Sequence, residues 1–244
     1  MLLPNPTPGL HWRGIAPPLA LSDYRVIAFD MDSTLISIET LDEMADLMGR
    51  KAEVAALTEA AMRGEIVDYK QSLRERVALL AGMPEAALDE VYEHRLRINP
   101  GAETLIAACK AEGLTCLLVT GGFTCFTDRL RARLGLDDVR ANVLEVEDER
   151  LTGRLLPQPW GDICDGEEKR RKLLEVCAAL GVGPDRAIAV GDGANDLPMM
   201  RAAGLSVGYR AKPAVRQEVK VAIDEGGLDR LLELVRPRSC FPDV

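Results

Sequence analysis

Two aspartates follow a short apolar run near the start of the chain, and their spacing is the first feature that can support chemistry. Residues 26–29 (VIAF) are all apolar, which is typical of a strand buried on both faces of a parallel sheet. Asp30 and Asp32 come directly after it. Because ligands bind beyond the carboxyl ends of strands in such sheets, both carboxylates are predicted to point into a candidate site.

Two carboxylates this close cannot both stay charged in a dry pocket unless a cation lies between them or one keeps a proton. Both arrangements suit phosphoryl transfer. With Mg²⁺ bound, ionised Asp30 can attack a phosphorus atom, while protonated Asp32 donates to the leaving oxygen and later accepts a proton from water. The alternative is an Asx turn or helix cap after the strand, and the D-x-D spacing alone does not separate the two interpretations.

Two further predicted strands also end in polar residues. Thr120-Gly121-Gly122 is predicted to form a strand-to-helix turn, where a hydroxyl and glycine N–H groups can approach an anion. Asp192, Asn195 and Asp196 lie in the sequence GDGAND, and their oxygens suit a hard cation. Each segment also has a structural alternative, because turns need glycine and Asp or Asn often caps a helix.

The elements that must position these residues begin with a run of helices after the first strand. Apolar periodicity, glycine stops and a proline entry predict four helices, over residues 39–49, 53–63, 69–80 and 85–96. Four consecutive helices cannot all be crossovers of a parallel sheet. Residues 37–98 are therefore predicted to form a helical cap that is inserted after the first strand and covers the site.

From residue 99 onward helices and strands alternate, which indicates a parallel sheet. The predicted helices are 102–112, 123–134, 168–180 and 228–235, the predicted strands are 114–119, 187–190, 205–208 and 221–223, and the predicted hairpin joins 143–146 to 151–155. The helix over 168–180 begins with a basic run, residues 169–172. Such a run is usually a solvated face, but one of its cations can be placed for an anion.

The predicted fold is therefore of the α/β class: a three-layer Rossmann-like parallel sheet core with an inserted four-helix cap and a small β-hairpin. The predicted core comprises residues 24–36 and 99–236, and the cap comprises residues 37–98. An extended N-terminal arm (1–23), which contains five prolines and no periodic pattern, and a C-terminal tail (237–244) complete the chain.

Bulk composition narrows the class of protein. The chain has 244 residues, 47% hydrophobic and 28% charged, with no apolar run approaching the ~20 residues that span a bilayer. The net charge of −9 argues against a nucleic-acid or membrane surface as the main partner. The six cysteines form no C-x-x-C pair and there are two histidines, so neither a zinc site nor a disulfide framework is expected. The N-terminus lacks a secretory signal, which predicts a cytoplasmic protein.

The order of these motifs matches a known family. The chain resembles the haloacid dehalogenase superfamily of phosphotransferases and, within it, the phosphoserine phosphatase family, over about residues 22–236. The segments that carry this resemblance are FDMDST (29–34), AMRGE (61–65), SLRERV (72–77), GGFT (121–124) and GDGANDLPM (191–199).

The resemblance implies a role for each carboxylate of the core. Asp30 is the expected nucleophile and Asp32 the expected general acid and base. Mg²⁺ is expected to bind the Asp30 carboxylate, the Asp32 main-chain oxygen and Asp192, and Asp196 is expected to support the metal without touching it.

The resemblance also implies four residues that handle the phosphoryl group. Thr120 and the N–H of Gly121 are expected to hold its oxygens. Lys169 is expected to neutralise the charge that develops on it, and Asn195 is expected to orient it.

In the cap, the resemblance places Glu39 against the substrate ammonium, Arg76 against its carboxylate and Tyr69 beside the ligand. A carboxylate and a guanidinium can recognise a zwitterion by opposite charge, and the arginine can do so with two parallel hydrogen bonds. A plain phosphate ester needs neither group. The small-molecule substrate implied is O-phosphoserine, which would be hydrolysed to serine and phosphate through an aspartyl-phosphate.

Two rival functions remain open at this stage. One is another small-molecule phosphatase or phosphotransferase of the same superfamily. The other is a non-catalytic module that binds a phosphorylated ligand, although binding alone needs no nucleophile such as Asp30. The sequence does not define the oligomeric state.

Overall fold

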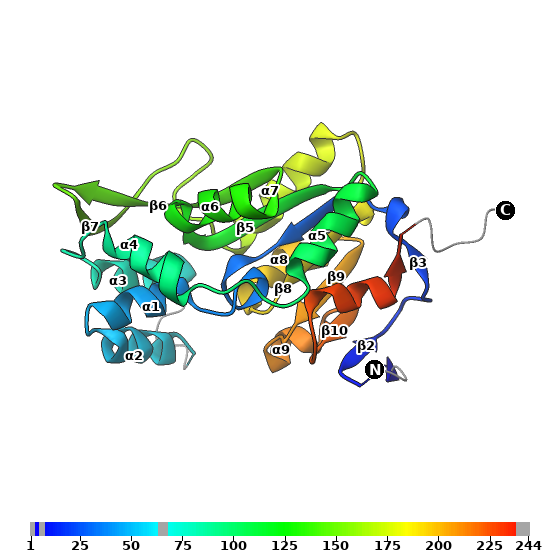
Figure 1. Cartoon of the computed structure of the whole chain (residues 1–244), viewed down its shortest axis with the longest axis horizontal. Helices are drawn as coiled ribbons and strands as arrows, with labels where there is room; N and C mark the ends of the chain where they lie inside the picture. Colours follow the sequence, from blue (N-terminus) through cyan, green and yellow to red (C-terminus); the bar gives the residue numbers. More distant parts are fainter. Residues whose placement is uncertain (1–2, 5–7, 63–67, 238–244) are drawn as a thin grey trace.

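The structure is a computed structural model that describes residues 3–4, 8–62 and 68–237 (Figure 1). Some of the predictions fall partly or wholly beyond these residues, among them the predicted N-terminal arm at residues 1–2 and 5–7. The end of the predicted helix 53–63, the last three residues of the AMRGE segment and the tail after residue 237 lie outside the described residues.

The described chain forms a nine-stranded sheet with the strand order β1-β2-β10-β9-β8-β4-β5-β6-β7. The six strands from β10 to β6 are parallel, while β7 and the pair β1-β2 run antiparallel to their neighbours. The strands are β1 (Leu3–Pro4), β2 (Leu10–Trp12), β4 (Val26–Phe29), β5 (Thr115–Phe123), β6 (Asp138–Glu147), β7 (Arg150–Leu156), β8 (Ala187–Gly191), β9 (Leu205–Tyr209) and β10 (Val221–Ile223). The strand that carries Asp30 is therefore central, as predicted.

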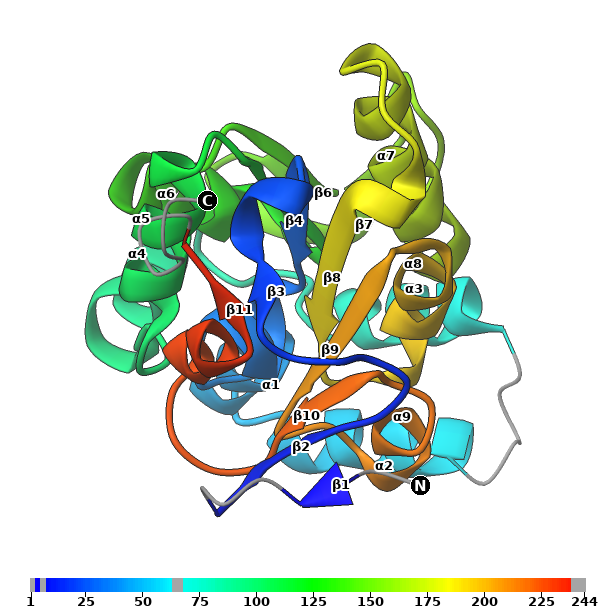
Figure 2. The same cartoon turned by 90° about the vertical axis from the view of Figure 1, so that its right-hand side faces the viewer.

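Helices cover both faces of this sheet, which gives the predicted three layers (Figure 2). Along β4, Ile27 and Phe29 belong to one apolar cluster, and Val26 and Ala28 belong to the other. The alternation follows from the two-residue period of a strand. The first cluster includes residues of α5 (Ala102–Ala111) and α6 (Thr124–Leu134), and the second includes residues of α7 (Gly166–Ala179), α8 (Leu197–Ala202) and α9 (Pro213–Arg216).

The helices of the predicted cap gather at one end of the molecule, the end that the β6-β7 hairpin also reaches (Figure 1). They are α1 (Thr40–Leu47), α2 (Lys51–Met62), α3 (Tyr69–Ala78) and α4 (Ala87–Glu90), and α4 continues as a wider helical turn over Val91–Arg95. Gly49 ends the first of these segments with φ of 68°, which glycine adopts without strain. The four predicted helices are present in the described residues, with bounds shifted by a few positions.

Asn99 joins the two connections between these helices and the sheet. Its side-chain amide, 4% exposed, donates to the carbonyls of Thr34 at 2.8 Å and of Ile36 at 3.0 Å. A backbone bridge between Ile36 and Ile98 lies beside it. The segment that leaves the sheet after β4 and the segment that returns to it before α5 are therefore held together by hydrogen bonds.

Several predictions about local structure were wrong. Thr120-Gly121-Gly122 lies inside the extended strand β5 and not in a strand-to-helix turn, because β5 continues to Phe123. The final predicted helix is a 3₁₀ segment, Leu228–Glu233, followed by the short strand β11 (Val235–Arg236).

The N-terminal segment is more than an extended arm. Strand β2 pairs with β10 and so extends the central sheet, while β3 (Leu19–Ala20) pairs with β11 in a second, two-stranded sheet. A buried Leu10 anchors the first of these strands in the apolar core. The prolines around these short strands concealed the pairing, because proline cannot donate to a strand ladder and so argues against strand structure in its neighbourhood.

The hairpin is present where predicted but is longer, and it contacts the cap helices. The N–H of Gly82 donates to the carbonyl of Leu151 at 2.8 Å, and the N–H of Leu151 donates to the carbonyl of Met83 at 2.9 Å. Its turn residues Asp148 and Glu149 both have positive φ. This contact makes the hairpin a bridge between the sheet and the helices after β4.

Five cysteines of the described chain, at positions 109, 116, 125, 164 and 177, are free thiols. Burial raises the pKa of the Cys116 and Cys164 thiols to about 12. They therefore act as small apolar side chains. No helix among the described residues combines the length and the apolar composition needed to cross a membrane.

Candidate active site

The loop after β4 directs two carboxylates along different paths. Asp30 extends the strand, and its N–H donates to the carbonyl of Val190 in β8 at 3.0 Å. In the next turn Asp32 is extended, and Ser33 takes a left-handed conformation with φ of 55°. Asp32 Oδ1 then accepts a hydrogen bond from the N–H of Thr40 at 2.8 Å, at the first turn of α1. The side chain of Asp32 thus links the loop after β4 to the first turn of α1 by a hydrogen bond.

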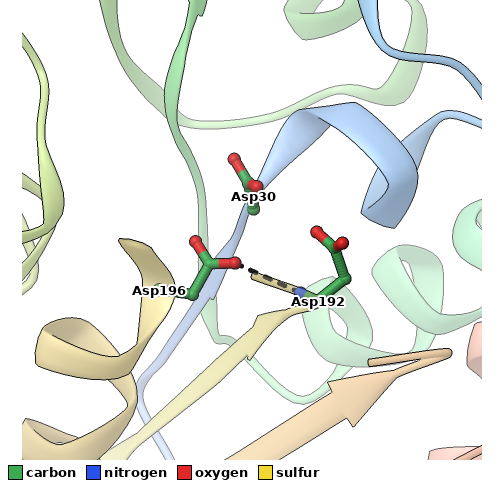
Figure 3. A group of neighbouring side chains, drawn as sticks. All are labelled: Asp30, Asp192 and Asp196. Carbon is green, nitrogen blue, oxygen red and sulfur yellow. Dashed lines mark hydrogen bonds between the residues drawn. The ribbon is translucent and has the colours of Figure 1, made fainter. Parts of the chain in front are cut away.

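Three buried carboxylates meet beyond the ends of β4 and β8. One oxygen from each of Asp30, Asp192 and Asp196 lies within 4.8 Å of the others (Figure 3). They face one another because β4 and β8 are parallel neighbours in register, with Phe29 opposite Val190. The strand-end rule therefore predicted their proximity correctly for Asp30 and Asp192.

Lys169, at the start of α7, is fully buried among these carboxylates. Its Nζ lies 2.7 Å from Asp30 Oδ1 and 2.7 Å from Asp196 Oδ1. The contact with Asp196 is a hydrogen bond. The contact with Asp30 is an ion pair without hydrogen-bond geometry, and Asp30 Oδ1 has no hydrogen-bond partner among the described residues. Of the basic run 169–172, Lys169 is the residue that contacts Asp30 and Asp196, and its role toward a bound anion stays a prediction.

Asp196 has both of its oxygens occupied by the protein. Oδ1 accepts from Lys169, while Oδ2 accepts from the N–H groups of Asp192 at 3.1 Å and Gly193 at 3.0 Å. A Cβ on Gly191 would lie 2.4 Å from Asp196 Oδ2, so this close approach requires glycine. Asp196 is therefore placed to orient the loop around Asp192, while Asp30 and Asp192 keep oxygens for a ligand.

Burial and mutual repulsion make these carboxylates resist ionisation. Burial, together with the negative charge of Asp30, raises the pKa of Asp192 to about 7 and that of Asp196 to about 6. Burial raises the pKa of Asp32 well above its usual value, and the charges of Glu39 and Asp30 raise it further. The pKa of Lys169 is well above its usual value, because Asp196 and Asp30 outweigh the opposing effect of burial.

These observations fit a hard divalent cation. The donor set is oxygen only, and Asp30 Oδ1 is buried without a hydrogen-bond donor. Burial and the neighbouring charges of Asp30 and Asp196 raise the pKa of Asp192, and a bound cation would favour its ionised form. The cluster contains, beside the predicted ligands Asp30 and Asp192, the side chain of Asp196, whose oxygens are already bonded. The third predicted ligand, the main-chain oxygen of Asp32, is not a side-chain atom and stays a prediction.

Thr120 and Gly121 line the same pocket as Asp30 and Asp192, from within the last four residues of β5. Thr120 is buried, and its Oγ1 accepts a hydrogen bond from the N–H of Gly122 at 2.9 Å. A Cβ on Gly121 would lie 2.0 Å from the hydroxyl of Tyr69, so any side chain there would displace Tyr69. The glycine thus lets a helix of the cap approach the core strand.

The three predicted cap residues face the same pocket. Glu39 accepts a hydrogen bond from the Ser33 hydroxyl at 2.7 Å. Arg76 and Tyr69 come from α3, and the Nε of Arg76 donates to the Ser72 carbonyl of its own helix at 3.3 Å. Burial raises the pKa of the Tyr69 phenol, which therefore stays neutral.

The pocket has a volume of about 190 Å³ and combines core and cap residues. All the predicted site residues line this pocket except Lys169 and Asp196, which contact its lining residues Asp30 and Asp192. The pocket is lined by Asp30, Asp32, Glu39, Thr40, Leu41, Tyr69, Leu73, Arg76, Thr120, Gly121, Gly122, Phe123, Asp192, Asn195 and Lys212.

Lys212 is the charged lining residue that sequence reasoning missed. Its Nζ lies 3.7 Å from Asp192 Oδ2, and its N–H donates to the carbonyl of Asp192 at 3.0 Å. The sequence feature that could have indicated Lys212 is its position just after the predicted strand 205–208. The carboxyl end of that strand lies at the same edge of the sheet as the other polar strand ends. Its position in a short loop before Pro213 gave no motif of its own.

Comparison with known proteins agrees with this geometry. The profile of the haloacid dehalogenase-like hydrolase family matches residues 27–201. A phosphoserine phosphatase of Albidiferax ferrireducens is 66% identical over 230 residues, which cover 94% of this chain and 97% of that protein. The chain therefore belongs to the haloacid dehalogenase-like hydrolases and, within them, to the phosphoserine phosphatase family.

Solved structures of this family have the same fold. A phospho-aspartyl intermediate analogue of phosphoserine phosphatase superposes with a TM-score of 0.80 at 34% identity, covering 87% of this chain and 99% of that chain. A substrate-bound phosphoserine phosphatase complex gives a TM-score of 0.79 at 34% identity, with the same shares of each chain covered. The α/β fold predicted from the sequence is thus confirmed.

Proposed function

We propose that this chain hydrolyses O-phosphoserine to serine and phosphate through an aspartyl-phosphate at Asp30. The observation that carries the proposal is the composition of the pocket, in which core carboxylates and Thr120 meet the cap residues Glu39 and Arg76. The core residues suit any phosphate monoester, whereas the two cap charges suit the ammonium and carboxylate of an amino acid. The names of the relatives support the same substrate.

In the first step, a carboxylate oxygen of Asp30 attacks phosphorus and the bond from phosphorus to the serine oxygen breaks. Asp32 gives its proton to that oxygen, a role favoured by its raised pKa. Thr120 and the N–H of Gly121 hold phosphoryl oxygens, Asn195 orients the group, and Lys169 offsets the charge that develops.

In the second step, water attacks phosphorus, Asp32 accepts the proton of that water, and the bond between Asp30 and phosphorus breaks. Asp30 and Asp192 would hold Mg²⁺ with the main-chain oxygen of Asp32, and Asp196 would orient the loop. When bound, Mg²⁺ supplies positive charge that favours ionised Asp30 and the transferring phosphoryl oxygens. We further propose that residues 37–98 act as the cap over residues 24–36 and 99–236.

The test is a phosphate-release assay over phospho-amino acids and sugar phosphates, with and without Mg²⁺. We expect kcat/KM for O-phosphoserine to exceed that for every other ester, and EDTA to remove the activity. Preference for a sugar phosphate would favour another small-molecule phosphatase of the superfamily. Binding of phosphoserine without phosphate release would favour the non-catalytic alternative.

A further inference from the structure

Strand β5 is irregular at the residues that are proposed to hold phosphate. Its pairing with β6 is in register up to Val119 opposite Arg140, and it resumes at Phe123 opposite Asn142. Residues 120–122 therefore bulge against a single residue of β6. Bulges redirect the backbone next to active sites, and their polar groups need partners from outside the regular ladder.

Asn142 provides that partner. Its side chain is 1% exposed, and its Nδ2 donates to the carbonyl of Gly121 at 2.8 Å. Its Oδ1 accepts from the N–H of Cys164 at 2.8 Å. The two neighbours define the orientation of the amide, because a flipped amide would set its oxygen against a carbonyl and its nitrogen against an N–H group.

The first of these bonds acts on the Thr120 hydroxyl through one peptide group. The carbonyl of Gly121 and the N–H of Gly122 belong to the same peptide, which Asn142 holds at one end and Thr120 Oγ1 at the other. Since Thr120 Oγ1 accepts this N–H, its own proton is directed elsewhere and can be donated to a phosphoryl oxygen. The bond from Asn142 polarises the peptide and strengthens the next bond in the series.

The second bond reaches the segment before Lys169. Cys164 precedes Asp165, whose Oδ1 caps α7 by accepting from the N–H of Glu168 at 2.9 Å. The N–H of Lys169 donates to the carbonyl of Asp165 at 2.9 Å. One buried amide therefore ties the bulge of β5 to the start of the helix that carries the buried lysine.

We propose that Asn142 is a positioning residue that sets the Thr120–Gly122 bulge and the Lys169 segment at the spacing one phosphoryl group requires. This inference rests on the proposed phosphatase chemistry and adds to it a residue outside the pocket wall. It predicts that Asn142 affects every phosphate ligand equally, whereas Glu39 and Arg76 affect only ligands with an amino-acid group.

Two variants remove the hydrogen bonds of Asn142 to a different extent. Asn142→Asp keeps an acceptor for Cys164 and places an oxygen against the Gly121 carbonyl, while Asn142→Ala removes both bonds. We expect both variants to raise the inhibition constant of inorganic phosphate by ~5–100-fold, the range for leaving a buried backbone group without its partner. The kcat/KM values for phosphoserine and p-nitrophenyl phosphate should fall by a common factor.

Ser206→Ala is the matched control, because it too removes a hydrogen bond between a buried side chain and the backbone: the N–H of Lys220 donates to Ser206 Oγ at 3.0 Å. It should lower Tm and leave the inhibition constant of phosphate unchanged. If Asn142→Asp does not fold, Asn142→Ser replaces it with a neutral side chain too short to reach both partners.

Three outcomes would overturn the proposal. The first is that the Asn142 variants have a lower Tm but bind inorganic phosphate as tightly as the wild type. The second is that their kcat/KM falls for phosphoserine but not for p-nitrophenyl phosphate. The third is that Ser206→Ala raises the inhibition constant of phosphate as much as the Asn142 variants do. Failure of the proposed function is a separate result. If the wild type releases phosphate from p-nitrophenyl phosphate but not from phosphoserine, the substrate assignment fails, and Asn142 is still tested by phosphate inhibition.

Discussion

The proposed core (residues 24–36 and 99–236) and the proposed cap (residues 37–98) satisfy their charged groups in different ways. In the core, Lys169 is enclosed between Asp30 and Asp196, and the latter has hydrogen bonds on both oxygens. In the cap, Arg76 makes no salt bridge with any residue that the structure describes, and its Nε bonds only to its own helix. The core is thus arranged before substrate arrives, whereas Arg76 faces the pocket with its charge still available for a ligand.

This difference indicates a division of labour. Buried groups that hold one another in place can stabilise a transition state without reorganising, which suits the chemical steps. A guanidinium that lacks an ionic partner gains one when an anionic substrate group arrives, which suits discrimination. Substitutions in the core should therefore affect all phosphate esters, and substitutions in the cap should affect one class of ester. The predictions that follow test this contrast from the largest expected effect to the smallest.

The largest effect is expected from Asp30→Asn. An amide is a poor nucleophile, so turnover of phosphoserine and of p-nitrophenyl phosphate should both fall by roughly 10⁴-fold or more. Mass spectrometry of acid-quenched enzyme should detect a phosphorylated peptide from the wild type and none from the variant. Near-normal hydrolysis by Asp30→Asn, or a phosphoenzyme trapped on it, would contradict the mechanism.

Asp32→Asn should cost less, by ~10²–10⁴-fold, because it removes proton transfer but leaves the nucleophile. The amide oxygen can still accept from the N–H of Thr40, so the start of α1 should be preserved and Tm should change little. Burst kinetics with p-nitrophenyl phosphate, whose leaving group needs no proton, should show faster formation than breakdown of the phosphoenzyme. Wild-type rates in both steps would refute the assigned role.

Arg76→Ala tests the cap side of the contrast. Loss of one partner of a charged contact in a closed site should lower kcat/KM for phosphoserine, by an amount that corresponds to ~2–5 kcal/mol of lost transition-state stabilisation. Hydrolysis of p-nitrophenyl phosphate, which lacks ammonium and carboxylate groups, should change little. Glu39→Gln should behave in the same way, because its amide keeps an acceptor for the Ser33 hydroxyl while it removes the charge. Equal losses on both esters would show that these residues serve cap closure and not recognition.

The raised carboxyl pKa values predict how metal and pH act on stability. Asp192 and Asp196 have pKa values of about 7 and about 6 in the folded chain, above the usual value for aspartate. A carboxyl group whose pKa is higher in the folded than in the unfolded chain binds its proton more tightly when folded. Its contribution to the free energy of unfolding is therefore present at low pH and is lost as the pH rises from about 4 to about 7. In EDTA, Tm should therefore be higher at pH 5.5 than at pH 8, by several degrees.

Mg²⁺ should reverse this trend, because it binds the ionised form and stabilises the folded state by mass action. The change from pH 8 to pH 5.5 does not protonate carboxylates whose pKa is lowered by an ion pair. Glu175 is an example, because a hydrogen bond from Lys172 lowers its pKa. The check is calorimetry at both pH values with EDTA and with Mg²⁺, using Asp192→Asn, in which the pH dependence should be smaller. A metal-free Tm that rises toward pH 8 would contradict the prediction.

The sequence predicted the fold where its patterns are local. The apolar run 26–29 and the strand 187–190 showed the centre of the sheet, and apolar periodicity showed the helices that follow β4. The pairing of β2 with β10 could not be predicted, because it joins residues more than two hundred positions apart through a proline-rich segment. The bulge at Thr120 was also hidden, since glycines there suit a turn as well as an irregular strand.

For the site, the rule that ligands bind at strand ends predicted the meeting of Asp30, Thr120 and Asp192. The choice of Lys169 within a basic run came from the family resemblance, and the structure shows its physical basis in full burial against two carboxylates. Asn142 and Lys212 were not predicted. One lies inside a hairpin strand with no motif around it, and the other is a single lysine among many.

The smallest effect is expected at the edge where cap and core meet. Arg74 pairs with Asp162, and Lys70 lies 3.5 Å from Asp165, so two ion pairs join α3 to the loop before α7. The Arg74 and Asp162 side chains are 50% and 54% exposed, and exposed pairs contribute ~0–1 kcal/mol. Arg74→Ala should therefore lower kcat/KM for phosphoserine by less than about fivefold, and high salt should reduce the difference from wild type.

Arg74 and Arg76 provide a matched comparison, because they lie two positions apart on one helix and differ in what they face. Arg76 lines the pocket, whereas Arg74 contacts the rim of the core. If closure of the cap depended chiefly on ions at the rim, Arg74→Ala would slow both phosphoserine and p-nitrophenyl phosphate as strongly as Arg76→Ala slows phosphoserine. We expect instead that only Arg76→Ala separates the two substrates, because of the two arginines only Arg76 lines the pocket. Parallel kcat/KM measurements on the two variants at low and high salt distinguish these outcomes.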